Sequence, residues 1–338
     1  MEAPTDPVLR VRDLGVTFAT NDGEVAVVRE VDLDVARGEV VALLGESGSG
    51  KSVTARAVMG LLEENARATA AELRLDGHDL TTLPERSRRE LRGTVISLVM
   101  QDALSALNPV LSIGDQLGEL FRVRRGERRA VARAHAIELL GLVGIPAPER
   151  RIDDYPHQFS GGMRQRILIA MAIALEPRLL IADEPTTALD VTVQAQILDL
   201  LNRLREQLGM GILLITHDLG VVMEVADRLA VMYAGRVVES GDADRVLDRP
   251  GHPYTQALLR SMPQSGRPGD PLLAIPGSPP SPAQTPPGCS FHPRCPVRLD
   301  LCRERRPEPV EVQPGRLAAC HRATELLDAT LVISGVDR

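Results

Sequence analysis

Eight residues between a predicted strand and a predicted helix place the strongest constraint on this chain. They fit the pattern G-x-x-x-x-G-K-[ST], with an apolar run at 39–44 before them and a helical pattern at 53–62 after them. Glycines in such a loop let backbone N–H groups surround a phosphate at the positive end of a helix. The sequence therefore predicts a phosphate-binding P-loop made of Gly45, Glu46, Ser47, Gly48, Ser49, Gly50, Lys51 and Ser52.

Two side chains of this loop have specific predicted roles. Lys51 is expected to reach the β- and γ-phosphates of a nucleotide, and the Ser52 hydroxyl to bind Mg²⁺. Lys51 is the only lysine of the chain, whereas its other basic residues are arginines. A compact ammonium on a flexible stem fits a P-loop better than a planar guanidinium, so the position of this one lysine supports the interpretation.

Length and composition bound the remaining possibilities. The 338 residues have room for two domains, or for one large domain with an appendage. Because the net charge is −7 and no long basic block is present, a general nucleic-acid-binding surface is not expected. The first residues lack the basic and apolar parts of a signal peptide, and the longest apolar run, 167–175, is too short to span a membrane. We therefore expect a soluble, cytosolic protein whose role at a membrane depends on partners.

The order of strand and helix patterns predicts an α/β fold. Strands at 8–18 and 24–33, joined by a turn at 21–23, predict an N-terminal antiparallel β-subdomain. Later strands at 179–182, 211–216 and 229–233, with a helix at 193–208, predict a parallel sheet flanked by helices. A helical insertion is expected at about 103–175. Residues 1–248 would form the nucleotide-binding domain, and the proline-rich residues 249–338 an irregular extension.

Polar side chains that follow three predicted strands complete the expected site. Asp183 and Glu184 follow the strand at 179–182, where Asp183 is suited to hold Mg²⁺ and Glu184 to deprotonate an attacking water. His217 follows the strand at 211–216 and is placed to contact a γ-phosphate. Gln101 follows a short strand at 95–100. Each of these residues alone is a weak signal, and the P-loop upstream strengthens it.

A second glycine-containing stretch at 159–166 indicates how the site is completed. Its small residues Ser160, Gly161 and Gly162 open a helix and make another phosphate cradle. One chain does not need two cradles for one γ-phosphate, but two chains packed head to tail do. With this stretch included, the chain resembles the ATP-binding subunits of ABC transporters. The family's motifs occur in their usual order over residues 8 to about 245: Walker A, Q-loop, signature, Walker B, D-loop and switch histidine.

The resemblance implies an ATP- and Mg²⁺-dependent ATPase whose RecA-like P-loop core carries the helical insertion. It implies that ATP lies between this chain's P-loop and a partner's signature, that Asp190 of the D-loop at 188–190 belongs to this interface, and that His217 and Gln101 assist catalysis. It also implies that Gln101 contacts Mg²⁺ and links it to the helical insertion, which touches the membrane subunits. The residue that stacks on adenine stays open, Phe18 being the aromatic candidate near the N-terminus.

Three stretches narrow the resemblance to the dipeptide/oligopeptide importer subfamily. They are residues 100–109, residues 155–166 and Gly-His-Pro-Tyr-Thr at 251–255. Phe159 and Met163 replace the usual signature Leu and Gln, and the Q-loop lacks the commoner Phe and Pro around it. The implied partners are a second ATPase subunit, identical or related, two transmembrane permeases and, indirectly, an extracytoplasmic solute-binding protein, at the cytoplasmic face of the membrane. Alternatives are a nickel or other small-solute importer and a soluble ABC ATPase acting on ribosomes or DNA.

All four cysteines lie in the extension, in the pattern C-x5-C-x6-C-x17-C: Cys289, Cys295, Cys302 and Cys320. A cytosolic compartment disfavours disulfides. Four thiolates suit a structural Zn²⁺ or an iron–sulfur cluster equally well by number, and the absence of close C-x2-C pairs favours iron–sulfur. Residues 288–296 also resemble the peptide-importer extension, some members of which hold a [4Fe-4S] cluster. The sequence thus predicts a [4Fe-4S] cluster, with Zn²⁺ as the alternative.

Overall fold

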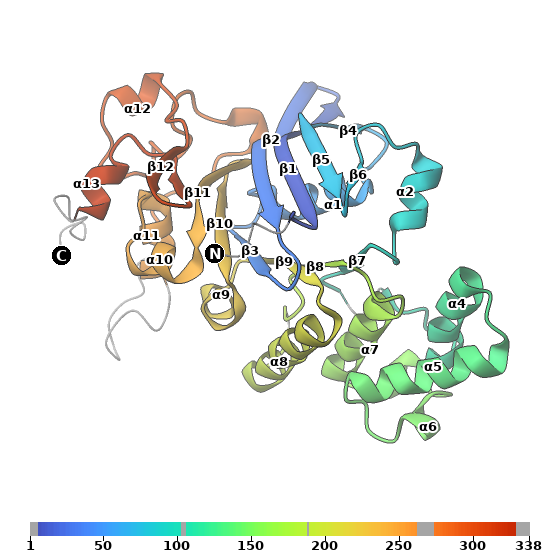
Figure 1. Ribbon diagram of the computed structural model, residues 1–338. Coiled ribbons are helices and arrows are strands. Elements are labelled where there is room, and N and C mark those ends of the chain that lie inside the picture. The colour runs from blue at the N-terminus through green and yellow to red at the C-terminus, as the bar shows by residue number, and fades with distance from the viewer. Residues whose placement is uncertain (1–5, 103–105, 188, 262–273, 329–338) are drawn as a thin grey trace. The chain divides into compact units, whose positions relative to one another are not determined.

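A computed structural model of the protein describes residues 6–102, 106–187, 189–261 and 274–328 (Figure 1). The described residues form two compact units, which we treat separately. Unit 1 consists of the described parts of Met1–Leu9, Val35–Glu39 and Leu75–Leu214, and unit 2 of those of Arg10–Asp34, Val40–Arg74 and Ile215–Arg338. The predicted domain boundary at residue 248 falls inside unit 2 and stays a prediction.

Unit 1 contains the strands expected around Gln101 and Asp183. β7 (Ile96–Val99) pairs in parallel with β8 (Leu179–Asp183), with Ile96 opposite Leu179, and β9 (Gly211–Thr216) lies on the other side of β8. All six residues of β9 are buried, as continuous apolar runs in a covered parallel sheet should be. Unit 1 also contains the short strand β6 (His78–Asp79), the helix α2 (Glu85–Leu91) and the long helix α8 (Val191–Leu208).

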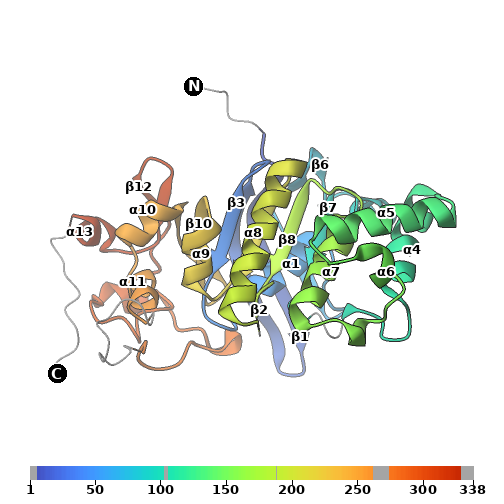
Figure 2. The same cartoon turned by 90° about the horizontal axis from the view of Figure 1, so that it is seen from below.

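The helical insertion predicted at about 103–175 corresponds to a group of helices in unit 1. α4 (Ile113–Arg125), α5 (Arg129–Leu142), α6 (Pro148–Arg151) and α7 (Gly161–Ile173) lie side by side in both views, with the 3₁₀ turn η1 (Pro156–Gln158) before α7 (Figures 1 and 2). Local signals explain where α4 begins and ends. The Ser112 side chain accepts a hydrogen bond from the Asp115 N–H, and Gly126 ends the helix in the left-handed conformation.

Unit 2 contains the N-terminal β-subdomain, the strand that leads into the P-loop and the strands that pair beside it. β1 (Leu9–Thr20) and β2 (Gly23–Val35) form the predicted hairpin, and β4 (Ala66–Thr69) pairs antiparallel with β1, which also neighbours β5 (Glu72–Leu75) in strand order. β3 (Val40–Leu44) runs parallel to β10 (Arg228–Tyr233), which pairs antiparallel with β11 (Arg236–Asp242). The helices of this part are α1 (Lys51–Met59), α9 (Leu219–Val225) and α10 (Ala243–Asp248).

The extension contains more regular structure than the sequence predicts. Its strand β13 (Arg316–Ala318) pairs antiparallel with β11, placing Ala318 opposite Glu239, and β12 (Val310–Gln313) pairs with β13. The sequence does not predict β13 because this strand is only three residues long and includes a buried arginine, Arg316, whose charge is paired with Glu239. Further elements are α11 (Pro253–Arg260), η2 (Pro282–Gln284), α12 (Leu301–Glu304) and α13 (Ala323–Leu327).

An aromatic cluster joins the extension to the rest of unit 2. The chain has four Phe, three Tyr and no Trp, yet Tyr233, Tyr254 and Phe291 pack together with ring centroids 4.5–5.4 Å apart. Aromatic pairs at such distances contribute beyond the area that they bury. In the described ranges, no helix combines the length and the apolar character that crossing a membrane requires.

Candidate nucleotide site

The predicted P-loop lies between β3 and α1, and its glycines are required by its geometry. A Cβ at Gly45 would come within 2.2 Å of the Met232 carbonyl oxygen, which excludes any side chain there. Gly50 precedes α1 with φ 107°, in the left-handed region that glycine adopts without strain, and a Cβ there would also meet Met232. The close packing against Met232 therefore requires glycine at these two positions, independently of any bound ligand.

The interior of the loop has the features of a phosphate cradle. The Lys51 side chain is only 5% exposed, and its Nζ donates to the carbonyl oxygens of Gly45 (2.7 Å) and Glu46 (3.0 Å). Within the described part of the chain, the buried Ser49 hydroxyl has no hydrogen-bond partner. A buried polar atom without a partner is costly, and a polar ligand in the loop would satisfy it. These residues therefore fit a bound phosphate group.

In unit 1 the structure brings two predicted site residues together. The Gln101 side-chain amide donates to Oε2 of Glu184 at 2.8 Å, and the Thr187 hydroxyl donates to the same oxygen at 2.9 Å. Glu184 directly follows β8, next to Asp183, and has a left-handed backbone with φ 48°. Such strain in a residue other than glycine concentrates at functional sites. Thr187 is a contact that the sequence analysis missed.

The signature residues begin α7, as predicted. The Ser160 side chain accepts from the Met163 N–H at 3.3 Å, and both Ser160 and Gly161 are exposed. Gly162 packs against α8, where a Cβ would lie 2.6 Å from a methyl group of Val193. The exposed Asp190 caps that same helix by accepting from the Val193 N–H at 2.9 Å. Signature and D-loop thus both contact Val193 of α8 within unit 1. Ala188 of the D-loop lies outside the described residues.

His217 lies in unit 2 and directly follows β9, as the sequence predicts. It is exposed, and the next residue, Asp218, caps α9 by accepting from the Gly220 N–H at 2.8 Å. The strand therefore delivers the imidazole to the carboxyl end of the sheet, where ligands of open α/β sheets bind.

The four cysteines are close together in the structure. All four are free thiols and line one cavity, formed together with His252, Phe291 and neighbouring residues of the extension. Burial, together with the nearby thiols, raises the pKa of Cys289 to about 11 and that of Cys320 to about 12. Among the described residues, no three His, Cys, Asp or Glu side chains are arranged to hold a single metal ion. The cavity thus brings the four thiols together, and His252, His292 and His321 also belong to its lining.

Two further residues near the P-loop were missed by sequence reasoning. Arg294, in the extension, forms an ion pair with Glu46, and the Tyr254 hydroxyl accepts from the Glu46 N–H. Both lie in stretches on which the resemblance rests, at 288–296 and 251–255. Tyr254 and Arg294 lie 208 and 248 positions after Glu46, and the sequence does not reveal their contacts with it.

Comparison with known proteins identifies the family. Residues 28–187 match the model of the ABC transporter family, and residues 238–302 match the model described as the oligopeptide/dipeptide transporter C-terminal region. The dipeptide transport ATP-binding protein DppD of Escherichia coli is 46% identical over 93% of this chain and 96% of its own length. This chain belongs to the ABC transporter ATP-binding proteins of the dipeptide and oligopeptide type. The oligopeptide transport ATP-binding protein OppD of Salmonella typhimurium is likewise 46% identical, over 96% of both chains.

Solved structures support the same assignment for the nucleotide-binding part. An ATP-binding cassette solved as a dimer in a post-hydrolysis state, with ADP and Pi bound, aligns with a TM-score of 0.62 at 27% identity over 70% of this chain and 98% of its own. CbiO1 of Clostridium perfringens, part of the transporter complex CbiONQ, aligns with a TM-score of 0.61 at 28% identity, over 72% of this chain and 92% of its own. The predicted ABC fold is confirmed, and the chain is an ABC ATPase.

Proposed function

We propose that this ABC ATPase powers the uptake of dipeptides or oligopeptides through an ABC importer. The observation that carries the proposal is that similarity to dipeptide and oligopeptide transport proteins extends through the extension as well as the ATPase core. A putative peptide import ATP-binding protein of Brucella melitensis, 48% identical over 95% of this chain, is consistent with it. A nickel or other small-solute importer is the alternative within the class.

The proposed chemistry assigns a role to each predicted site residue. Lys51 and the P-loop N–H groups hold the phosphates, while Ser52, Asp183 and Gln101 surround Mg²⁺. Glu184 takes the proton of the attacking water, and His217 contacts the γ-phosphate. The hydrogen bond between Gln101 and Glu184 supports a common site for these two residues.

Two ATPase chains are needed for this chemistry. In the proposed arrangement the chains pack head to tail, and the partner's signature closes on the nucleotide held by this chain's P-loop. The exposure of Ser160, Gly161 and Asp190 supports this arrangement, because an interface must be reachable before it forms. The partner is a second copy or a related ATPase.

Two permease subunits and, through them, a solute-binding protein complete the proposed importer, with this chain at the cytoplasmic face of the membrane and no nucleic acid among its partners. The test is a pull-down from detergent-solubilised membranes with tagged Glu184→Gln protein and ATP. Recovery of two multi-span proteins and an ATPase, with a solute-binding protein that holds peptides, is the expected result. Recovery of ribosomes or nucleic acid without membrane proteins, or of a nickel-binding protein, would overturn it.

We further propose that the four cysteines ligate a [4Fe-4S] cluster. All four thiols line one cavity of the extension, which supports a ligand that they share. Because no protein carboxylate or imidazole is needed, the four thiolates suffice as ligands.

Anaerobically prepared protein is therefore expected to contain about four iron and four acid-labile sulfide per chain. Replacing Cys302 by Ser should remove most of the iron. Ser290→Ala, in the same segment but outside the cysteine-lined cavity, should keep it. Zinc at about one per chain without iron would contradict the cluster.

A further inference from the structure

Arg294 connects the cysteine-containing extension to the P-loop. Its guanidinium donates to both carboxylate oxygens of Glu46, at 2.8 and 3.0 Å. The Arg294 side chain is 5% exposed and that of Glu46 25%. A two-point charged hydrogen bond that is largely shielded from water is both directional and strong. Arg294 immediately precedes Cys295, one of the residues that line the cysteine cavity.

Glu46 is held at three points, two of which come from the extension. Besides its carboxylate on Arg294, its backbone N–H donates to the Tyr254 hydroxyl at 2.9 Å. Its carbonyl oxygen accepts from Lys51 Nζ at 3.0 Å. A continuous series of contacts therefore leads from the extension through one P-loop residue to the lysine that is predicted to bind phosphate.

Arg294 is itself fixed in place, so it can act as a support. Its Nε donates to the Pro276 carbonyl at 2.9 Å, and its guanidinium lies 5.9 Å from the ring centres of both Tyr233 and Phe291. Burial opposes the charge of Arg294, but the hydrogen bonds with Glu46 and Tyr233 outweigh it and raise its pKa. The guanidinium thus stays charged and ordered at any pH at which the protein works.

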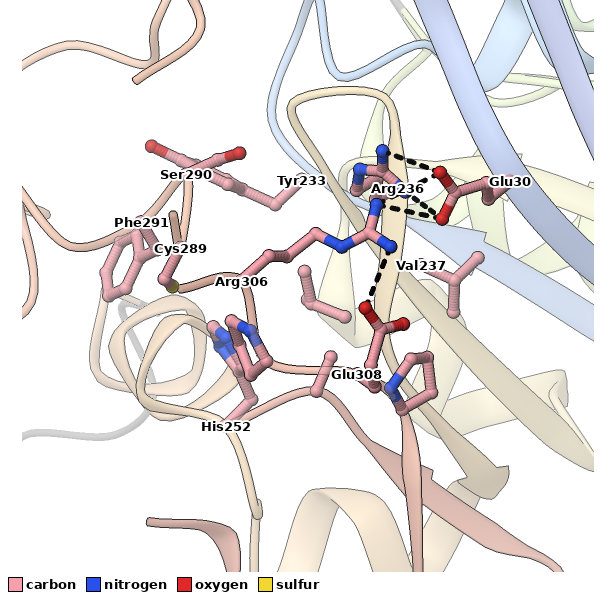
Figure 3. A pocket seen from close by; sticks show the side chains of 14 residues that line it. Glu30, Tyr233, Arg236, Val237, His252, Cys289, Ser290, Phe291, Arg306 and Glu308 are labelled. Carbon is pink, nitrogen blue, oxygen red and sulfur yellow. Dashed lines mark hydrogen bonds and ion pairs between the residues drawn. The ribbon is translucent and has the colours of Figure 1, made fainter. Parts of the chain in front are cut away.

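A second contact of the extension provides a natural comparison. In the pocket shown in Figure 3, Arg306 of the extension and Arg236 of β11 both point at the carboxylate of Glu30 on β2. Their hydrogen bonds lower the Glu30 pKa to about 2. Glu30 is half exposed, and the contact does not involve the P-loop. Arg306 therefore joins the extension to the nucleotide-binding part without touching the predicted phosphate site.

We propose that Arg294 is a positioning residue for ATP binding: by holding Glu46, the extension sets the conformation of the P-loop and the orientation of Lys51. The proposal rests on the P-loop's assignment as the ATP site and goes beyond it, because it makes nucleotide affinity depend on the extension. A structural change in the cysteine-containing segment would reach the phosphate site through the ion pair between Arg294 and Glu46.

The test compares full-length wild-type protein with Arg294→Ala, Arg294→Lys, Glu46→Gln and the Glu46→Gln/Arg294→Ala double variant. Equilibrium binding of a fluorescent ATP analogue and steady-state ATPase kinetics are measured on each. Arg294→Ala is expected to weaken nucleotide binding and raise the KM for ATP about tenfold, with kcat changed less than about twofold. Arg294→Lys should retain part of the nucleotide affinity that Arg294→Ala loses. The double variant should bind nucleotide no more weakly than whichever of Glu46→Gln and Arg294→Ala has the lower affinity.

Arg306→Ala is the matched control, because it removes the other arginine contact of the extension and should leave nucleotide affinity unchanged. Equal losses in Arg306→Ala and Arg294→Ala, or additive losses in the double variant, would overturn the proposal. Glu46→Gln keeps the extension intact, so it tests the contact even if Arg294→Ala fails to fold. Wild-type protein that bound no ATP would refute the nucleotide site itself, whereas unchanged binding by Arg294→Ala refutes this inference alone.

Discussion

Replacing Glu184 with Gln should abolish ATP turnover and leave ATP binding intact. The amide is isosteric with the carboxylate and keeps an oxygen that can accept from Gln101 and Thr187, but it cannot take a proton from water. Loss of a general base typically costs about 10²- to 10⁴-fold in rate. We therefore expect kcat to fall at least about 100-fold while the affinity for ATP changes little.

Phosphate release under saturating ATP measures the rate, and equilibrium binding of an ATP analogue measures affinity. Glu176→Gln is a matched control: Glu176 also lies in unit 1 and has a left-handed backbone with φ 54°, but its carboxylate pairs with Arg125 at the surface. That variant should hydrolyse ATP at the wild-type rate. Turnover that survived in Glu184→Gln would show that another group deprotonates the water.

The parts of the site that the sequence predicts are those that local rules determine. The P-loop is contiguous, and its glycines, strand and helix are all visible within about twenty residues. Asp183 ends β8, while Glu184 and His217 directly follow β8 and β9, so their place at the end of a strand follows from the pattern. The backbone strain of Glu184 does not follow from the pattern, because it depends on the surrounding structure.

The parts that the sequence misses depend on contacts between distant segments. Glu46 and Arg294 are 248 positions apart, and nothing in either segment specifies the other. The same reason explains β13: three residues with a charged side chain do not form a strand pattern, and only pairing with β11 makes them one. For the cysteines, the sequence shows their clustering, whereas the shared cavity appears only in the fold.

Removing the Arg316 side chain should strongly destabilise the extension. The Arg316 and Glu239 side chains are 2% and 0% exposed, and they form an ion pair at 2.9 Å. Glu239 also accepts from the N–H groups of Gly251 and His252, at 2.7 and 3.1 Å, where the extension begins. Without Arg316 the buried carboxylate keeps these two hydrogen bonds but loses its countercharge, which costs about 3–5 kcal/mol of unfolding free energy.

Thermal unfolding and limited proteolysis of the extension measure this loss in Arg316→Ala. Arg133→Ala is the control, because its carboxylate partner Asp153 is exposed and such surface pairs contribute little to stability. Adding Glu239→Gln to Arg316→Ala should restore part of the stability, since the neutral amide can still accept a backbone N–H. An Arg316→Ala protein as stable as wild type would contradict the role of this pair.

The pH dependence distinguishes a buried charge from lost packing. Burial already raises the Glu239 pKa, and removing Arg316 raises it further. A carboxyl group whose pKa is higher in the folded than in the unfolded state destabilises the fold fully above the folded pKa. This penalty decreases as the pH falls below the folded pKa and vanishes below the unfolded pKa. The stability difference between wild type and Arg316→Ala should therefore shrink as the pH is lowered toward about 4.3, the ordinary pKa of a glutamate, whereas a packing defect would leave it constant.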